Sequence, residues 1–287
     1  MRLFGATRGK RQRGGYAMME SGREFEGKRV IVSGCFSGMG EAAARMLLDR
    51  GAEVHGFDYK ESALPLASFT CVDLRDPASI DAGVASLDGN FDALLNCAGL
   101  PQGAPILDIV KVNFIGTRHL TDRLVPRMKQ GSAIASIAST GGLGWSMRVP
   151  LHMEFLGHGT YDSALAWCGE HPAEIESAYI FSKEALIIWT MRQSFSLIGH
   201  GIRINCIMPG PTQTPMMAHF EANTPAGMLD AGTQPINRYA RAEEQAAPLV
   251  FLCTDGASYI NGVTLPVDGG FTAGLATGQI GYESLTG

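Results

Sequence analysis

A tyrosine and a lysine four residues apart form the first group in this sequence that could carry chemistry. Tyr179 and Lys183 lie in a stretch with helical periodicity, so the i, i+4 spacing places both side chains on one helix face. A free phenol has a pKa of about 10, and a nearby ammonium lowers that pKa. Such a phenol could exchange a proton with an alcohol while a hydride leaves. The pair alone is weak evidence, because Tyr-x-x-x-Lys occurs by chance in many helices.

A glycine-rich turn precedes the first helical pattern. Gly34, Gly38 and Gly40 lie between an apolar strand pattern at 28–32 and a helical pattern at 40–50. The first glycine permits a tight turn, the second a close approach to a pyrophosphate, and the third close packing of helix on strand. The helix N-terminus adds free N–H groups and the positive end of a dipole. In this strand–turn–helix context the glycines predict a dinucleotide site.

An acidic residue closes the second strand pattern, at 53–57. Asp58 follows the glycines at about the distance, roughly 20 residues, at which an acid bonds the adenosine ribose. A carboxylate there accepts hydrogen bonds from both ribose hydroxyls and repels a 2′-phosphate. The glycine turn holds no arginine or lysine to offset that repulsion, and Lys60 is the one nearby base. The sequence therefore favours NAD(H) over NADP(H).

Strand and helix patterns alternate along most of the chain. Further strands are predicted at 68–72, 91–95, 133–137, 203–207 and 263–267, and helices at 78–88, 104–129, 173–199 and 243–254. Strands that alternate with helices and are apolar on both faces indicate an α/β fold, a single-domain doubly wound parallel sheet of about seven strands. We predict a flexible basic leader at 1–26, one catalytic domain at 27–271 and a Gly-rich tail at 272–287.

Composition excludes several classes of function. The net charge is −5, and removing the five basic residues of the acid-free first fourteen leaves −10 for the rest. That acidic body is a poor partner for nucleic acid. No stretch of about 18 apolar residues is present, so no membrane span is expected. The six cysteines and seven histidines are scattered, which predicts free thiols in the cytoplasm and no metal site.

The order of the motifs along the chain is more specific evidence than any one motif alone. Besides the glycine turn and the Tyr–Lys pair, the sequence contains, in order, Asp73 after the third strand, Asn96-Cys-Ala-Gly99, Asn113-Phe-Ile-Gly116, Ser136 at the fifth strand, Pro209-Gly-x-x-x-Thr214 and Asp268-Gly-Gly270. This ordered set resembles the short-chain dehydrogenase/reductase family over about residues 27–271. The resemblance implies a Rossmann-like enzyme that moves a hydride between a nicotinamide cofactor and an alcohol or ketone.

The resemblance also implies roles for particular residues. The catalytic set would be Asn113, Ser136, Tyr179 and Lys183, with the tyrosine as general acid/base, the serine on the substrate oxygen, the lysine on the nicotinamide ribose and the asparagine holding a water. The remaining cofactor contacts would come from residues around the pyrophosphate, the adenosine and the carboxamide: Gly34, Ser37, Gly38, Met39, Gly40, Asp58, Asp73, Leu74, Asn96, Ala98, Gly99, Pro209, Gly210, Thr212 and Thr214.

Two positions in these motifs need separate treatment. Ser136 fits the family position before x-Ala, but Ser139 offers a second hydroxyl three residues later, with a turn-capping role as its alternative. Cys97 stands where the family usually has asparagine or alanine, and we interpret it as a packing residue.

Two long connections leave the carboxyl ends of the strands, where ligands bind in such sheets. Residues 140–172 carry Trp145, Met147, Val149, Leu151, Met153, Phe155 and Leu156, and residues 210–242 carry Met216, Met217, Phe220, Met228 and Leu229. These side chains suit a bulky apolar substrate, although they could also only pack the connections down.

The long connection before Tyr179 is similar to the 3α-hydroxysteroid dehydrogenase/carbonyl reductase branch, which includes coniferyl-alcohol dehydrogenases. The resemblance implies a hydroxysteroid-like substrate, with an aryl-allylic alcohol as the alternative, and a homodimer or homotetramer. A non-catalytic NAD-binding sensor on the same fold is the competing hypothesis, and a broken catalytic set would be its signature.

Overall fold

A seven-stranded parallel sheet forms the centre of the molecule, in the order β3-β2-β1-β4-β5-β6-β9. The computed structural model describes residues 22–224 and 227–281. The strands of the sheet are β1 (Arg29–Ser33), β2 (Glu53–Asp58), β3 (Ser68–Cys71), β4 (Phe91–Asn96), β5 (Met128–Ile137), β6 (Arg203–Pro209) and β9 (Thr264–Val267). A separate two-stranded ladder joins β7 (Thr212–Gln213) to β8 (Ala240–Arg241). The predicted doubly wound α/β fold is confirmed.

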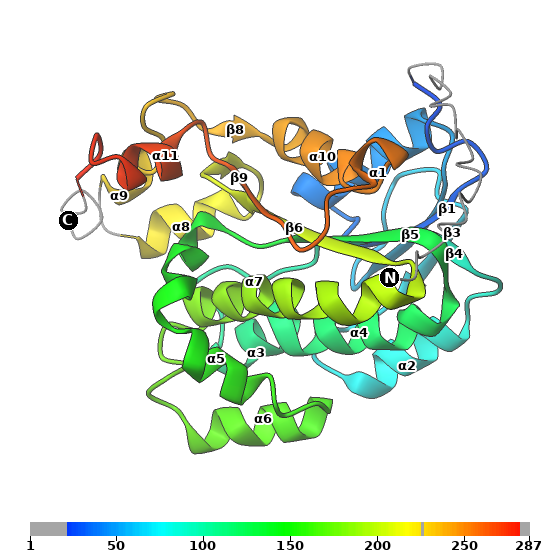
Figure 1. Cartoon of the computed structure of the whole chain (residues 1–287), viewed down its shortest axis with the longest axis horizontal. Coiled ribbons are helices and arrows are strands. Elements are labelled where there is room, and N and C mark those ends of the chain that lie inside the picture. Colours follow the sequence, from blue (N-terminus) through cyan, green and yellow to red (C-terminus); the bar gives the residue numbers. More distant parts are fainter. Residues whose placement is uncertain (1–21, 225–226, 282–287) are drawn as a thin grey trace, which may run out of the picture.

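Helices cover both faces of this sheet. Those on one face are α1 (Gly38–Asp49) and α10 (Ala242–Phe251), and those on the other are α2 (Pro77–Ala85), α3 (Ile106–Val110), α4 (Thr117–Leu124) and α7 (Ala178–Leu197) (Figure 1). Each layer encloses its own apolar core, because the central strands are buried on both sides. The carboxyl ends of β1, β2 and β4 meet at one edge, which brings the glycine turn, Asp58 and Gly99 together.

The single helix predicted at 104–129 is divided into four short elements. A π-helical turn, η1 (Lys111–Gly116), separates α3 from α4, and a short 3-10 turn, η2 (Val125–Arg127), ends the run. The Thr117 hydroxyl donates to the Val112 carbonyl, five residues back, which stabilises the wide turn. Pro126 lies in η2, and β5 then begins at Met128, five residues earlier than predicted. Such π-turns are frequent at functional sites, and this one contains Asn113.

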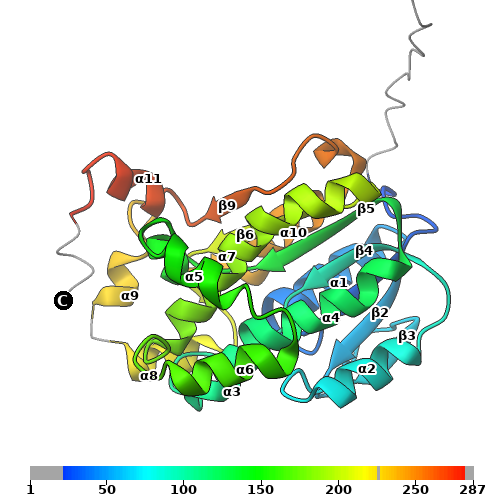
Figure 2. The same ribbon diagram turned by 60° about the horizontal axis from the view of Figure 1, so that its bottom comes forward.

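The connection 140–172 is structured along most of its length. It forms the 3-10 segment η3 (Thr140–Met147) and the helices α5 (Val149–Phe155) and α6 (Tyr161–Glu170), which lie along α7 and the α3–α4 run (Figure 2). The connection 210–242 holds α8 (Met217–Asn223) and α9 (Met228–Ala231), in addition to β7 and β8. We call η3, α5 and α6 with their turns, residues 140–170, the insertion.

Both predicted boundaries of the catalytic domain need correction. Phe25, which we placed in the leader, is fully buried in the core beneath β1 and α1. The short turn η5 (Asp255–Ala257) precedes β9. From residue 271 onward the chain forms α11 (Phe271–Ala276), and Phe271, Leu275 and Ile280 make a small apolar cluster. The rest of the predicted leader, residues 1–21, and of the predicted tail, residues 282–287, lie outside the described residues.

Candidate active site

The glycine turn between β1 and α1 is shaped by close backbone approaches. Gly34 has a φ of +76°, and a Cβ there would lie 2.5 Å from the Ala98 nitrogen on the neighbouring turn. A Cβ on Gly40 would collide with the Gly34 carbonyl. Ser37 precedes α1 and makes no side-chain cap, so the first N–H groups of this long helix remain available to an anion. The turn therefore fits a pyrophosphate.

Asp58 is oriented toward the same turn by two backbone donors. Its Oδ2 accepts a hydrogen bond from the Phe36 nitrogen at 3.0 Å, and its Oδ1 accepts one from the Lys60 nitrogen at 3.1 Å. Each carboxylate oxygen has a further lone pair for a ligand hydroxyl. The Lys60 ammonium lies over the rings of Phe36 and Tyr59, at 5.4 and 5.1 Å from their centres. Two aromatic faces thus attract the Lys60 ammonium, a base that could weaken the acidic character of this position.

A cleft of about 550 Å³ runs from this corner along the strand ends. Its nucleotide end is lined by Gly34, Ser37, Asp58, Asp73, Leu74, Ala98 and Gly99. Its other end is lined by Leu100, Pro101, Ala104, Met216 and His219. The first set is polar or glycine-rich and the second is mostly apolar, so the cleft suits a nucleotide joined to an apolar substrate.

Tyr179 and Lys183 lie one helical turn apart on α7, beside the end of β5. The Lys183 Nζ donates to the Ile137 carbonyl at 2.8 Å and lies 5.7 Å from the centre of the Tyr179 ring. Lys183 is 5 % exposed, and burial lowers its pKa to about 8. The Phe220 ring, from α8, packs edge-to-face with the Tyr179 ring, with 5.0 Å between the ring centres.

The pKa of Tyr179 differs from the sequence expectation. We expected the lysine to lower it, but burial raises the pKa of this phenol, and a hydrogen bond with Ser139 acts in the opposite direction. In this arrangement the phenol holds its proton at neutral pH. It is therefore set up as a proton donor, the role required when a carbonyl is reduced.

The hydroxyl that faces Tyr179 is that of Ser139 rather than Ser136. A Cβ built on Gly141 would lie 3.3 Å from both the Ser139 Oγ and a ring carbon of Tyr179. Ser136 is fully buried within β5, and its Oγ accepts a hydrogen bond from the Asn96 Nδ2 at 3.2 Å. A substrate cannot reach an atom that is covered in this way. Ser139 also caps η3 by accepting from the Gly141 nitrogen, so both roles proposed for it coexist.

Asn113 connects the substrate end of the cleft to the catalytic helix. Its Oδ1 accepts from the Leu100 nitrogen at 2.6 Å, and its Nδ2 donates to the Leu100 carbonyl and to the Ser182 hydroxyl. The carboxamide thereby fixes the turn after β4 against α7. The predicted water-holding role of Asn113 stays a prediction.

Comparison with known proteins identifies the family. The family described as "short chain dehydrogenase" matches residues 28–150, and the one described as "Enoyl-(Acyl carrier protein) reductase" matches residues 165–272. A coniferyl-alcohol dehydrogenase of Pseudomonas sp. is 34 % identical over 251 residues, covering 87 % of this chain and 98 % of that protein. The chain belongs to the short-chain dehydrogenase/reductase family. It is therefore an oxidoreductase, as the ordered motifs predicted.

Other relatives extend this finding. A 3α-hydroxysteroid dehydrogenase/carbonyl reductase of Comamonas testosteroni is 28 % identical, covering 85 % of this chain and 96 % of that protein. A 3α-hydroxysteroid dehydrogenase of Pseudomonas sp., solved with NADH, superposes with a TM-score of 0.74 at 26 % identity, covering 88 % of this chain and 99 % of that one. Both names belong to the branch that the sequence resembles.

Several residues assigned to the cofactor from the family motifs do not line the cleft. The buried Asn96 side chain, at the carboxyl end of β4, donates to the Thr121 and Ser136 hydroxyls. Met39 packs against the apolar core beneath α1. The Thr212 hydroxyl donates to the Gly210 carbonyl, while Thr214 lies beside Gly38. The roles of these residues and of Pro209, whose carbonyl accepts from the Thr140 hydroxyl, stay predictions.

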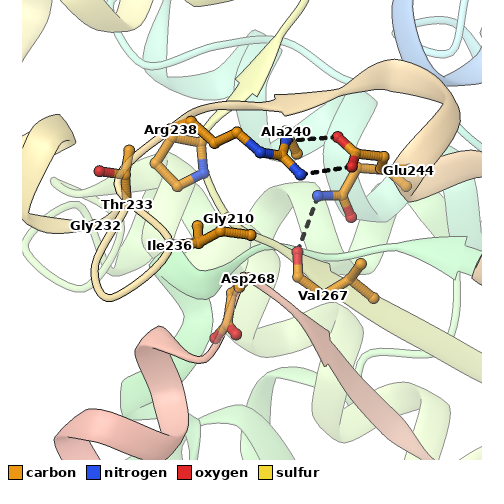
Figure 3. A pocket seen from close by; sticks show the side chains of 12 residues that line it. Gly210, Gly232, Thr233, Ile236, Arg238, Ala240, Glu244, Val267 and Asp268 are labelled. Atoms are coloured by element: carbon orange, nitrogen blue, oxygen red, sulfur yellow. Dashed lines mark hydrogen bonds and ion pairs between the residues drawn. The ribbon is translucent and has the colours of Figure 1, made fainter.

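Gly210 borders a second, smaller cavity. This cavity has a volume of about 160 Å³ and lies between the β6 and β9 ends and the loop before β8 (Figure 3). Its polar groups are largely paired with each other: Arg238 forms two bonds with Glu244, and Gln245 donates to the Val267 carbonyl. Among the described atoms that line it, the buried Gln245 Oε1 is an acceptor without a hydrogen-bond partner.

Sequence reasoning missed several groups at the cleft, among them two aromatic side chains and a histidine. Phe36 and Tyr59 border the Asp58 corner, and His219 lines the far end. The first two could have been noticed from their positions within the glycine turn and directly after Asp58. Nothing in the local pattern marks His219, which reaches the cleft only because α8 folds back over it. Cys97 lines the cleft and packs on the α1 layer, and burial raises the pKa of its thiol.

Within residues 22–224 and 227–281 the structure contains no group of three or more His, Cys, Asp or Glu side chains suited to a metal ion. In the same residues, every helix is too short or too polar to cross a bilayer.

Proposed function

We propose that this chain is an NAD(H)-dependent dehydrogenase that interconverts a bulky apolar secondary or allylic alcohol and its carbonyl compound. One observation carries the proposal: the Tyr179 phenol and the Ser139 hydroxyl lie together beside buried Lys183. The carboxylate of Asp58 lines the cleft, and so does Gly99, where an added Cβ would lie 3.8 Å from the Lys183 Nζ. When bound, a nicotinamide supplies or accepts the hydride.

The chain's own residues would handle the proton and the developing charge. In the reducing direction the Tyr179 phenol gives its proton to the substrate oxygen, and the same phenolate takes a proton back in the oxidising direction. The Ser139 hydroxyl donates a hydrogen bond to that oxygen and stabilises the charge that grows on it. The Lys183 ammonium stabilises the phenolate and is available to a ribose hydroxyl.

NAD(H) is the cofactor that the Asp58 corner supports. Its two oxygens are oriented by backbone N–H groups, and a ribose hydroxyl would complete their hydrogen bonding. A 2′-phosphate would face this carboxylate, and the two bases nearby are otherwise engaged: Lys60 lies over aromatic rings and Arg75 is paired with Asp73. Solved relatives are named with NADH and with NADPH, so the family alone does not decide between them.

The substrate end favours a flat apolar molecule. Leu100, Ala104 and Met216 line it, and the ring of Phe220 packs on Tyr179. The named relatives act on coniferyl alcohol and on 3α-hydroxysteroids, and the higher identity to the first keeps aryl-allylic alcohols in the proposal. The chemical feature that both share is a large apolar body next to the reacting carbon.

An absorbance assay of NADH formation and consumption tests this function. Steroid alcohols, aryl-allylic alcohols and cyclic ketones are offered in turn with NAD(H) and with NADP(H). We expect turnover of at least one apolar class with NAD(H), and a loss of several orders of magnitude in Tyr179→Phe, which still binds NADH. Turnover by Tyr179→Phe at the wild-type rate would remove the proposed proton donor.

We also propose a homo-oligomer that does not use the α4–α7 helix faces. Arg118 of α4 donates to the Thr160 carbonyl, and Arg192 of α7 donates to the Leu156 carbonyl. The insertion therefore covers part of these helix faces and keeps a second copy from packing on them. Light scattering during gel filtration measures the assembly state, and a concentration-independent monomer would contradict the proposal.

A further inference from the structure

The insertion reaches the nucleotide end of the cleft through one hydroxyl. Tyr161, the first residue of α6, places its phenolic oxygen 2.6 Å from the Arg75 carbonyl and 3.2 Å from the Leu74 carbonyl. Tyr161 is 5 % exposed, and burial raises the pKa of its phenol. The phenol therefore stays protonated and donates to these two backbone acceptors.

The segment that receives this hydrogen bond is a wall of the cleft. Asp73, Leu74 and Arg75 all line it beside the Asp58 corner. On the cleft side, the Arg75 guanidinium binds both oxygens of Asp73 at 2.7–3.1 Å. On the other side, Gly116 lies so close to the Leu74 carbonyl that a Cβ would collide with it. The wall is thus held by the Gly116 contact, by the Ser79 hydroxyl, which accepts from the Asp73 nitrogen, and by the insertion.

The position of Tyr161 is itself fixed. The Thr160 hydroxyl accepts from the Ser163 nitrogen, and Ser163 in turn bonds the Thr160 backbone, so a capping box begins α6 at this point. Arg118, which is 4 % exposed, donates to the Thr160 carbonyl at 3.1 Å. The Tyr161 ring also packs edge-to-face with the His119 ring, with 5.8 Å between the ring centres. The start of α6 is therefore tied to α4 before its tyrosine reaches the wall.

From this geometry we propose that Tyr161 is a positioning residue for the nucleotide, by which the insertion holds the Asp73–Arg75 wall in its binding conformation. The inference rests on the proposed function, because it concerns the same cofactor site. The insertion would then have two roles. It packs against the catalytic helix α7, and it also sets the affinity of the protein for the adenosine half of the cofactor.

The test compares Tyr161→Phe with Thr160→Ala. The first removes only the hydroxyl that reaches the wall. The second removes the helix cap but keeps the Tyr161 hydroxyl and the Arg118 hydrogen bond to the backbone carbonyl of residue 160, which still anchors the start of α6. Dissociation constants for NADH, AMP and nicotinamide mononucleotide are measured by tryptophan fluorescence, and each variant's melting temperature is recorded. We expect Tyr161→Phe to weaken NADH and AMP about 3- to 10-fold, the effect of one net hydrogen bond, with nicotinamide mononucleotide and kcat at saturating NADH unchanged.

Thr160→Ala is expected to lower the melting temperature without changing the affinity for AMP. Equal AMP affinity in Tyr161→Phe and the wild type would overturn the inference, as would an equal loss of AMP affinity in Thr160→Ala. A wild-type protein that binds neither NADH nor AMP would instead overturn the proposed function. The two failures are therefore distinguishable.

Discussion

The turn from β1 to α1 and the insertion after β5 border the same site, but different constraints select their residues. In the turn, Gly34 and Gly40 are required because any side chain there would strike backbone atoms. In the insertion, Phe155 and Trp167 are apolar because they pack with Phe181 beneath α7. A backbone constraint leaves a distinctive residue type at a fixed spacing. An apolar side chain is the same residue whether it meets the core or a ligand.

The largest predicted effect concerns the insertion as a packing unit. Phe155 is fully buried and its ring meets those of Phe114, Trp167 and Phe181 at 4.9–5.4 Å. We expect Phe155→Ala to lower the free energy of unfolding by about 3–5 kcal/mol, from lost burial and the cavity left behind. Urea denaturation followed by circular dichroism measures the change.

Met147 provides the matched control on the same insertion. It is 83 % exposed, so Met147→Ala should change stability by less than about 0.5 kcal/mol. The interpretation of the insertion as a packing unit would be wrong if Phe155→Ala had the wild-type free energy of unfolding but a different substrate preference among alcohols. In that case the insertion would serve the substrate, as the sequence suggested.

The second predicted effect concerns the end of β5, directly before the insertion begins. We expect Ser139→Ala to lower kcat about 10²- to 10³-fold, because a donor to the substrate oxygen is lost. Ser136→Ala should keep kcat close to the wild type and cost about 1 kcal/mol of stability, since the Asn96 amide loses one of its two acceptors. Steady-state kinetics on both variants decides between the serines. The reverse ranking would restore Ser136 as the catalytic hydroxyl.

Much of the sheet could be predicted from the sequence because its strands are short apolar runs that end in functional residues. β2 ends at Asp58 and β4 at Asn96, as the patterns indicate. The early start of β5 at Met128 and the π-turn at Asn113 could not be predicted, because both depend on tertiary contacts rather than on local propensity.

The candidate active site also contains features that the sequence predicts and features that it does not. The Tyr179–Lys183 spacing predicted their shared helix face, since helix geometry alone fixes it. The choice between two serines three residues apart depends on where the strand ends, and strand ends are among the features least defined by a sequence pattern. Tyr161 carries no local signal, because the carbonyls that it bonds are far away in the chain.

The smallest of these effects tests the nucleotide region. Asp58→Ala removes the carboxylate that would bind the ribose hydroxyls and repel a 2′-phosphate. We expect the ratio of kcat/KM for NADH to that for NADPH to fall about 10-fold, roughly 1.4 kcal/mol of discrimination. The ratio is the useful quantity, since loss of the Phe36 and Lys60 hydrogen bonds affects both cofactors alike. Lys60→Ala, which keeps the carboxylate, should leave the ratio near the wild-type value or raise it. A ratio that is unchanged in Asp58→Ala would mean that the carboxylate serves only to hold the turn. In that case the residues around the β1–α1 turn, like those of the insertion, could not be used to identify the ligand from the sequence.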